Sequence, residues 1–169
     1  MMLAIAMVLI AATQEADPLA PAREGKIACV APDRAARTCG STISYVRNTD
    51  GSYRTTTTLI LAFAPRTTMV GHADVTASAG MVCEVYRPET VDAAEVFVDG
   101  VPASDAVAGR WRAELRRDLT AYEGRKMCAT YRQQGDTIVT TTTMDGAFQQ
   151  GWGSTLIWVS PDDGYRLRD

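Results

Sequence analysis

The stretch STISYVRNTDGSYRTTTTLILAF, residues 41–63, has the pattern of a β-hairpin. Residues 41–48 predict a strand, and NTDG at 48–51 supplies turn-forming side chains that favour a chain reversal. In the returning strand, residues 53–63, alternate positions fall on two faces, and threonines give way to apolar residues. This strand is expected to begin half-exposed, to become buried on both faces, and to end before Pro65.

Further strands are predicted along the rest of the chain, where short apolar or threonine-rich runs lie between turn residues. They cover residues 67–75, 81–86, 95–98, 126–132, 137–144 and 155–159. Tyr131 and the four threonines at 140–143 resemble Tyr45 and the four threonines at 55–58. This similarity fits either an internal duplication or independent enrichment of threonine in half-exposed strands.

The clearest helix covers about residues 105–122, and a short helical piece is predicted at 88–94. Ser104 is suited to the N-cap, and Gly124 to the position just after the helix. One apolar stripe recurs at spacings of four and three residues: Val107, Trp111, Leu115, Leu119 and Tyr122. The sequence therefore predicts an α+β fold: a mostly antiparallel sheet of hairpins with one long amphipathic helix and short helical pieces.

The N-terminal residues 1–12, MMLAIAMVLIAA, are all apolar. They would span about 18 Å as a helix, which is too short for a bilayer core of about 30 Å. Their length and small residues predict a signal peptide of residues 1–12, extending to about 16. An apolar first element of the fold is the alternative. Residues 13–25, with two prolines, are predicted to be a flexible tether.

The four cysteines agree with export, because an even number in an exported chain is typical of disulfides. Four cysteines allow three pairings, of which we expect Cys29–Cys39 and Cys83–Cys128. The first pair flanks a predicted chain reversal, and the second joins two predicted strands of similar pattern. Zinc ligands usually occur in close pairs, which are missing from this sequence, so neither a metal nor a cofactor is expected.

Length and composition favour one soluble domain, residues 26–169. The chain has 169 residues, is 46% hydrophobic and carries a formal net charge of −3. A nucleic-acid partner is not expected at this charge, and no later apolar run is long enough to span a membrane once the signal is removed. We therefore predict a periplasmic or secreted protein.

His72 and Asp74 are the candidate catalytic residues. His72 is the one histidine of the chain, and on a strand it shares a face with Asp74, so the carboxylate could orient the ring. The sequence lacks a Gly-x-Ser-x-Gly elbow, and the glutamates are scattered rather than paired for glycoside hydrolysis. A half-exposed strand histidine without a catalytic role is the favoured interpretation.

Charge is unevenly distributed around the predicted helix. Residues 84–105 hold six acidic side chains and one basic, whereas residues 106–132 hold seven basic and three acidic. The helix arginines fit either an anionic partner, such as an envelope polymer, or a solvated helix that pairs with the acidic segment. We favour the second interpretation.

The segments GKIACVAPDRAARTC (25–39), SYVRNTDG (44–51) and WVSPDDGYR (158–166) together resemble a group of small, uncharacterised exported bacterial proteins with four cysteines. The resemblance implies export and one disulfide-bonded domain, and it implies no activity. We therefore expect an exported cell-envelope protein that is a non-enzymatic binding or structural module, whose partner is an envelope protein or an anionic polymer. A small hydrolase with a site around His72 is the alternative.

Overall fold

The predicted hairpin of residues 41–63 is present in the computed structural model, which describes residues 17–169. Strand β3 (Ser41–Arg47) pairs antiparallel with β4 (Tyr53–Phe63), and Tyr45 lies opposite Thr55. The predicted signal peptide, residues 1–12, lies outside the described residues. Within them, no helix has both the length and the apolar character needed to cross a membrane.

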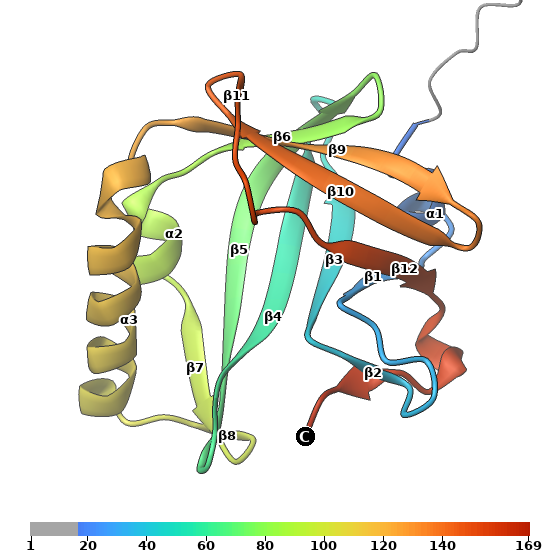
Figure 1. The fold of residues 1–169 in the computed structure, drawn as a ribbon. Helices are drawn as coiled ribbons and strands as arrows, with labels where there is room; N and C mark the ends of the chain where they lie inside the picture. Colours follow the sequence, from blue (N-terminus) through green and yellow to red (C-terminus); the bar gives the residue numbers. More distant parts are fainter. Residues whose placement is uncertain (1–16) are drawn as a thin grey trace, which may run out of the picture.

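Hydrogen bonding continues from this hairpin around a closed barrel of eight antiparallel strands (Figure 1). The order around the barrel is β4, β3, β1, β12, β10, β9, β6 and β5, and pairing of β5 with β4 closes it. The other six barrel strands are β1 (Ile27–Val30), β5 (Arg66–Ser78), β6 (Met81–Val85), β9 (Lys126–Gln134), β10 (Thr137–Met144) and β12 (Thr155–Val159). A two-residue strand, β11 (Ala147–Phe148), pairs antiparallel with the last two residues of β10.

The prediction of an α+β fold is wrong. The protein is mostly β, with 49% strand and 20% helix, and only one helix in the described residues reaches seven residues. Most individual strands were predicted correctly. The closure was missed because it depends on pairings between distant segments, such as Ile27 with Val159, which local periodicity does not reveal.

Side chains alternate between the barrel interior and its outer surface, as strand geometry requires. On β10 the inward residues Ile138, Thr140, Thr142 and Met144 are all buried, whereas the residues between them are partly exposed. At one end the interior is filled by an apolar cluster that includes Tyr53, Val82, Ile138 and Leu156. This apolar cluster holds the strands together at one end of the barrel. The interior also contains a cavity, which is described below.

Residues 17–25, which the sequence analysis predicts to be part of a flexible tether, are packed against the barrel. Helix α1 (Ala20–Arg23) is held by Asp17, which accepts a hydrogen bond from the Leu19 backbone N–H at 2.9 Å and pairs with Arg23. Leu19 is fully buried in the apolar cluster at the filled end. The two prolines predicted a loop, but Pro21 sits in the first turn of a helix, where proline is tolerated.

The predicted long helix is confirmed as α3 (Asp105–Leu119), followed by the 3₁₀ turn η1 (Thr120–Tyr122). It lies beside α2 (Pro88–Asp92) and β7 (Glu95–Val98), which stand between the helix and β5 (Figure 1). Trp111 and Leu115 of its apolar stripe pack against Met69 and Val96. The sheet is extended here by β7 and β8 (Val101–Pro102), while α2 links β6 to β7.

Both predicted disulfides are present, Cys29–Cys39 and Cys83–Cys128, with Cα–Cα distances of 5.2 and 4.0 Å. Cys83 and Cys128 lie directly opposite each other on β6 and β9.

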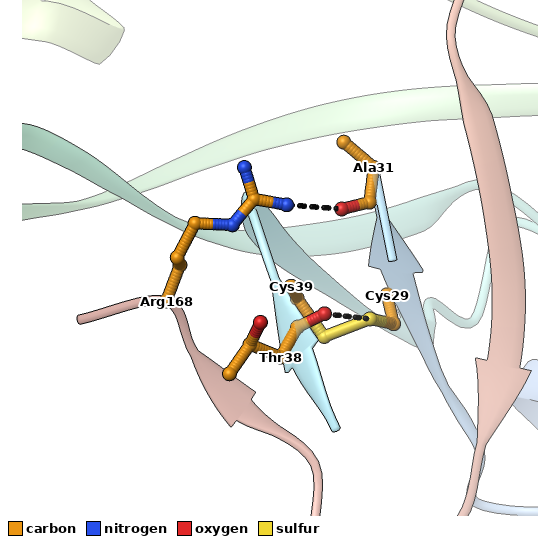
Figure 2. The surroundings of a disulfide bond; sticks show 5 residues. All are labelled: Cys29, Ala31, Thr38, Cys39 and Arg168. Carbon is orange, nitrogen blue, oxygen red and sulfur yellow. Dashed lines mark hydrogen bonds between the residues drawn. A yellow bond between two sulfur atoms is a disulfide. The ribbon is translucent and has the colours of Figure 1, made fainter. Parts of the chain in front are cut away.

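The Cys29–Cys39 bridge fixes the C-terminal segment as well as the loop that it closes. Cys39 belongs to β2 (Thr38–Cys39), which pairs in parallel with β13 (Arg166–Leu167). Strand β13 follows the short turn η2 (Pro161–Asp163) near the C-terminus. Near this bridge, Arg168 donates a hydrogen bond to the Ala31 carbonyl at 3.0 Å (Figure 2).

Candidate functional site

The barrel contains a partly open cavity of about 160 Å³, which shares Tyr45, Val75 and Val82 with the apolar cluster. All but one of its lining residues alternate with outward-facing neighbours on β3, β4, β5, β6, β9 and β10, so the cavity belongs to the interior of the barrel. Its lining is Ile43, Tyr45, Thr55, Thr57, Val75, Val82, Cys83, Glu84, Met127, Ala129, Tyr131 and Thr142. Six of these twelve side chains are apolar or cysteine and six carry a hydroxyl or carboxyl group, a mixture of apolar walls and polar groups that small-molecule sites also have.

Two tyrosines meet across this cavity. The Tyr45 and Tyr131 hydroxyl oxygens are 3.1 Å apart and share a hydrogen bond, although the residues come from β3 and β9. Burial raises the pKa of both hydroxyls, and the nearby Glu84 charge contributes to the increase. Both tyrosines are therefore neutral at physiological pH. These are the two tyrosines whose surrounding sequences resemble each other.

Glu84 is an acidic side chain on the inner face of β6, opposite Met127 of β9. Within residues 17–169 its carboxyl makes no ion pair, and burial alone raises its pKa above the ordinary value. A half-buried carboxylate without an ion-pair partner loses part of its hydration, and a proton or a cation bound beside it offsets this loss. Glu84 is therefore the most unusual ionisable group of the cavity.

An outer groove of about 560 Å³ gives access to the same carboxyl. Strands β5 and β6 pair only from Thr76–Cys83 to Ser78–Met81, so β5 is not paired with β6 beside Glu84. The groove and the inner cavity share Val75, Cys83 and Glu84 in their linings. Glu84 therefore lies between the solvent-facing groove and the interior of the barrel.

The predicted residues His72 and Asp74 both line the outer groove rather than the cavity. The Nδ1 atom of His72 lies 3.1 Å from the Thr56 hydroxyl on the neighbouring strand. Asp74 pairs with Arg54 at 3.6 Å, with both side chains more than half exposed. The structure thus brings His72 together with a threonine, and the one described ion pair of Asp74 is with an arginine.

One arginine of α3 pairs with the acidic segment, as the favoured interpretation of the charge pattern expects. Arg116 forms an ion pair with Asp92 of α2. The Arg112 Nε atom donates a hydrogen bond to the Ala94 carbonyl at 2.8 Å, which fixes the helix to the start of β7. Arg117 pairs with Asp118 of the same helix at 3.1 Å, so three of the four helix arginines have polar contacts within the protein.

Sequence reasoning missed Glu84, Tyr45 and Tyr131 as members of one site. The signal was present in MVCEVY, residues 81–86, where Glu84 interrupts a buried strand and shares a face with Val82. Which face points inward is decided by the barrel, so the local pattern could not separate this glutamate from an exposed one.

Comparisons with protein-family models, curated proteins and solved structures find no match to this chain. Within residues 17–169, no group of His, Cys, Asp and Glu side chains has an arrangement that could hold a metal ion. The barrel and its cavity are thus the observations on which a function can be argued.

Proposed function

We propose that this protein is an exported cell-envelope module that binds a small molecule inside its β-barrel and catalyses no reaction. The main support is the cavity of about 160 Å³ with the unpaired Glu84 carboxyl on its wall. An eight-stranded barrel is just wide enough to be filled by side chains or to hold one small ligand. Two disulfides, one joining β1 to β2 and the other joining β6 to β9, make the scaffold rigid, as suits a preformed site.

A hydrolase centred on His72 has less support. Its ring contacts Thr56, but the carboxylate expected to orient it, Asp74, is paired with Arg54. A nucleophile–base pair normally needs such a third group to fix the ring.

If the ligand binds inside the barrel, a larger side chain that fills the cavity should abolish binding. Benzyl alcohol is a suitable neutral probe, because an apolar cavity of about 150 Å³ holds benzene. At ten times its Kd the alcohol should stabilise the protein by about 1.4 kcal/mol, which raises Tm by about 3–6 °C. Ala129→Leu, which fills the cavity, should remove this shift in a thermal denaturation assay.

The matched control is Ala147→Leu, on the exposed strand β11 outside the cavity, which should keep the full shift. The proposed function is wrong if benzyl alcohol does not stabilise the wild-type protein, or if Ala129→Leu is stabilised as much as Ala147→Leu.

Export predicts a mature N-terminus between Thr13 and Asp17. The lower limit follows the apolar block, and the upper limit follows from Asp17, which pairs with Arg23 and caps the segment that buries Leu19. Intact-mass measurement of the protein recovered from the periplasm or medium checks this. A mature protein that begins after Leu19, or one that keeps Met1 in the cytosol, would contradict it.

A further inference from the structure

Three polar groups of the cavity, Glu84, Tyr45 and Tyr131, can accept hydrogen bonds from a ligand, whereas the Thr55 and Thr142 hydroxyls already donate to the Ala73 and Trp152 carbonyls. An ionised Glu84 only accepts, and the hydroxyl pair of Tyr45 and Tyr131 uses one of its two protons internally. Both hydroxyl oxygens keep a free lone pair, so three acceptor groups line one small space. A primary ammonium group carries three N–H donors and no acceptor, which complements this set.

The remaining walls determine what the ammonium group can be attached to. Ile43, Val75, Val82, Met127 and Ala129 are apolar and surround the same volume of about 160 Å³. A compact apolar body of about the size of benzene fits such a volume. The rest of the ligand must therefore be small and apolar.

A cationic ligand would also supply what the protein itself lacks. Among residues 17–169 no arginine, lysine or histidine forms an ion pair with Glu84. Arg54, Arg87 and Lys126 line the outer groove together with Glu84, and Arg54 pairs with Asp74 instead. Burial then disfavours the carboxylate and raises its pKa. A cation beside the carboxylate offsets this cost, as in any buried ion pair with good hydrogen bonds.

We infer that the barrel binds a small primary amine in its ammonium form, with the charged nitrogen on Glu84 and the tyrosine hydroxyls and the apolar body in the cavity. This inference rests on the proposed function and specifies its ligand class. The amine reaches the site through the outer groove, whose lining includes Glu84 and its neighbours Val75 and Cys83.

The test compares benzylamine with benzyl alcohol, which has the same shape and no charge, by isothermal titration calorimetry on the disulfide-bonded protein. Hydrogen bonds to charged groups contribute about 1.5–3 kcal/mol, so benzylamine should bind about 10-fold to 100-fold more tightly. Glu84→Gln keeps the shape of the side chain and removes its charge. It should lose most of this preference while its affinity for benzyl alcohol changes less than about 3-fold.

Glu89→Gln is the matched control, because Glu89 lines the outer groove and is absent from the lining of the cavity. It should bind both probes as the wild type does. The ligand comparison needs no variant, so it remains decisive even if Glu84→Gln does not fold.

Benzylamine binding no more tightly than benzyl alcohol would overturn the inference and leave the proposed function standing. An equal loss of both probes in Glu84→Gln, with circular dichroism unchanged, would also overturn it. Failure of both probes to bind the wild-type protein would overturn the proposed function as well.

Discussion

Replacing Cys83 and Cys128 together by alanine should lower Tm more than replacing Cys29 and Cys39 together. The bridges join residues 45 and 10 positions apart. Loop-closure entropy in the unfolded chain then assigns about 4 kcal/mol to the longer loop and about 3 kcal/mol to the shorter. For a domain of this size, about 4 kcal/mol corresponds to a decrease in Tm of about 8–16 °C.

The two double variants serve as controls for each other, because each removes one bridge and leaves the other intact. Cys29 and Cys39 are fully buried, so their replacement also removes packing contacts. This loss makes the expected difference in Tm between the two double variants smaller. Differential scanning calorimetry under non-reducing conditions makes the comparison. A larger decrease for Cys29→Ala/Cys39→Ala would show that packing around β2 and β13 outweighs the loop length.

Truncating Leu19 to alanine should destabilise the protein by about 2–5 kcal/mol, which is the range for a fully buried leucine. Leu19 is part of the apolar cluster that fills one end of the barrel, together with Tyr53 and Leu156. A flexible tether would give no such effect. The free energy of unfolding from urea denaturation checks the prediction.

The matched control is Val46→Ala on β3, where the side chain is 66% exposed and the change should stay within about 0.5 kcal/mol. If Leu19→Ala lowers the free energy of unfolding no more than Val46→Ala does, the N-terminal segment does not pack stably against the end of the barrel. Residues 17–25 are then the tether that the prolines suggested.

Local structure could be predicted well from the sequence, because it depends on neighbouring residues. The strands 53–63, 95–98, 137–144 and 155–159 have the predicted bounds, and α3 with η1 covers the predicted helix. Turn residues and alternation specify these elements before any tertiary contact forms.

The barrel could not be predicted in the same way, because its closure depends on which strands meet. Strand β1 was missed altogether, although it pairs with both β3 and β12. Its four residues, IACV, show no alternation of polar and apolar side chains that would distinguish a strand from a loop. Prolines 18 and 21 likewise concealed the buried Leu19, because proline is equally common in a tether and in the first turn of a helix.

The candidate site shows the same limit. His72 was selected by its chemistry, yet it lies on the outer groove with Thr56, whereas the cavity is lined by the neighbouring inward positions Thr55 and Thr57. In the sequence Glu84 is one of several scattered glutamates, and only the barrel fold shows that it lines the cavity. Side-chain type alone does not identify a site when a change of one position moves a residue to the opposite face of a strand.

A crystal structure of the protein with 4-bromobenzylamine tests the binding site most directly, because anomalous scattering locates the bromine independently of the model. The barrel account predicts bromine inside the barrel, with the ammonium nitrogen about 2.7–3.2 Å from the Glu84 carboxylate. Bromine found only in the outer groove or on the surface, with the interior of the barrel empty of ligand, would contradict it.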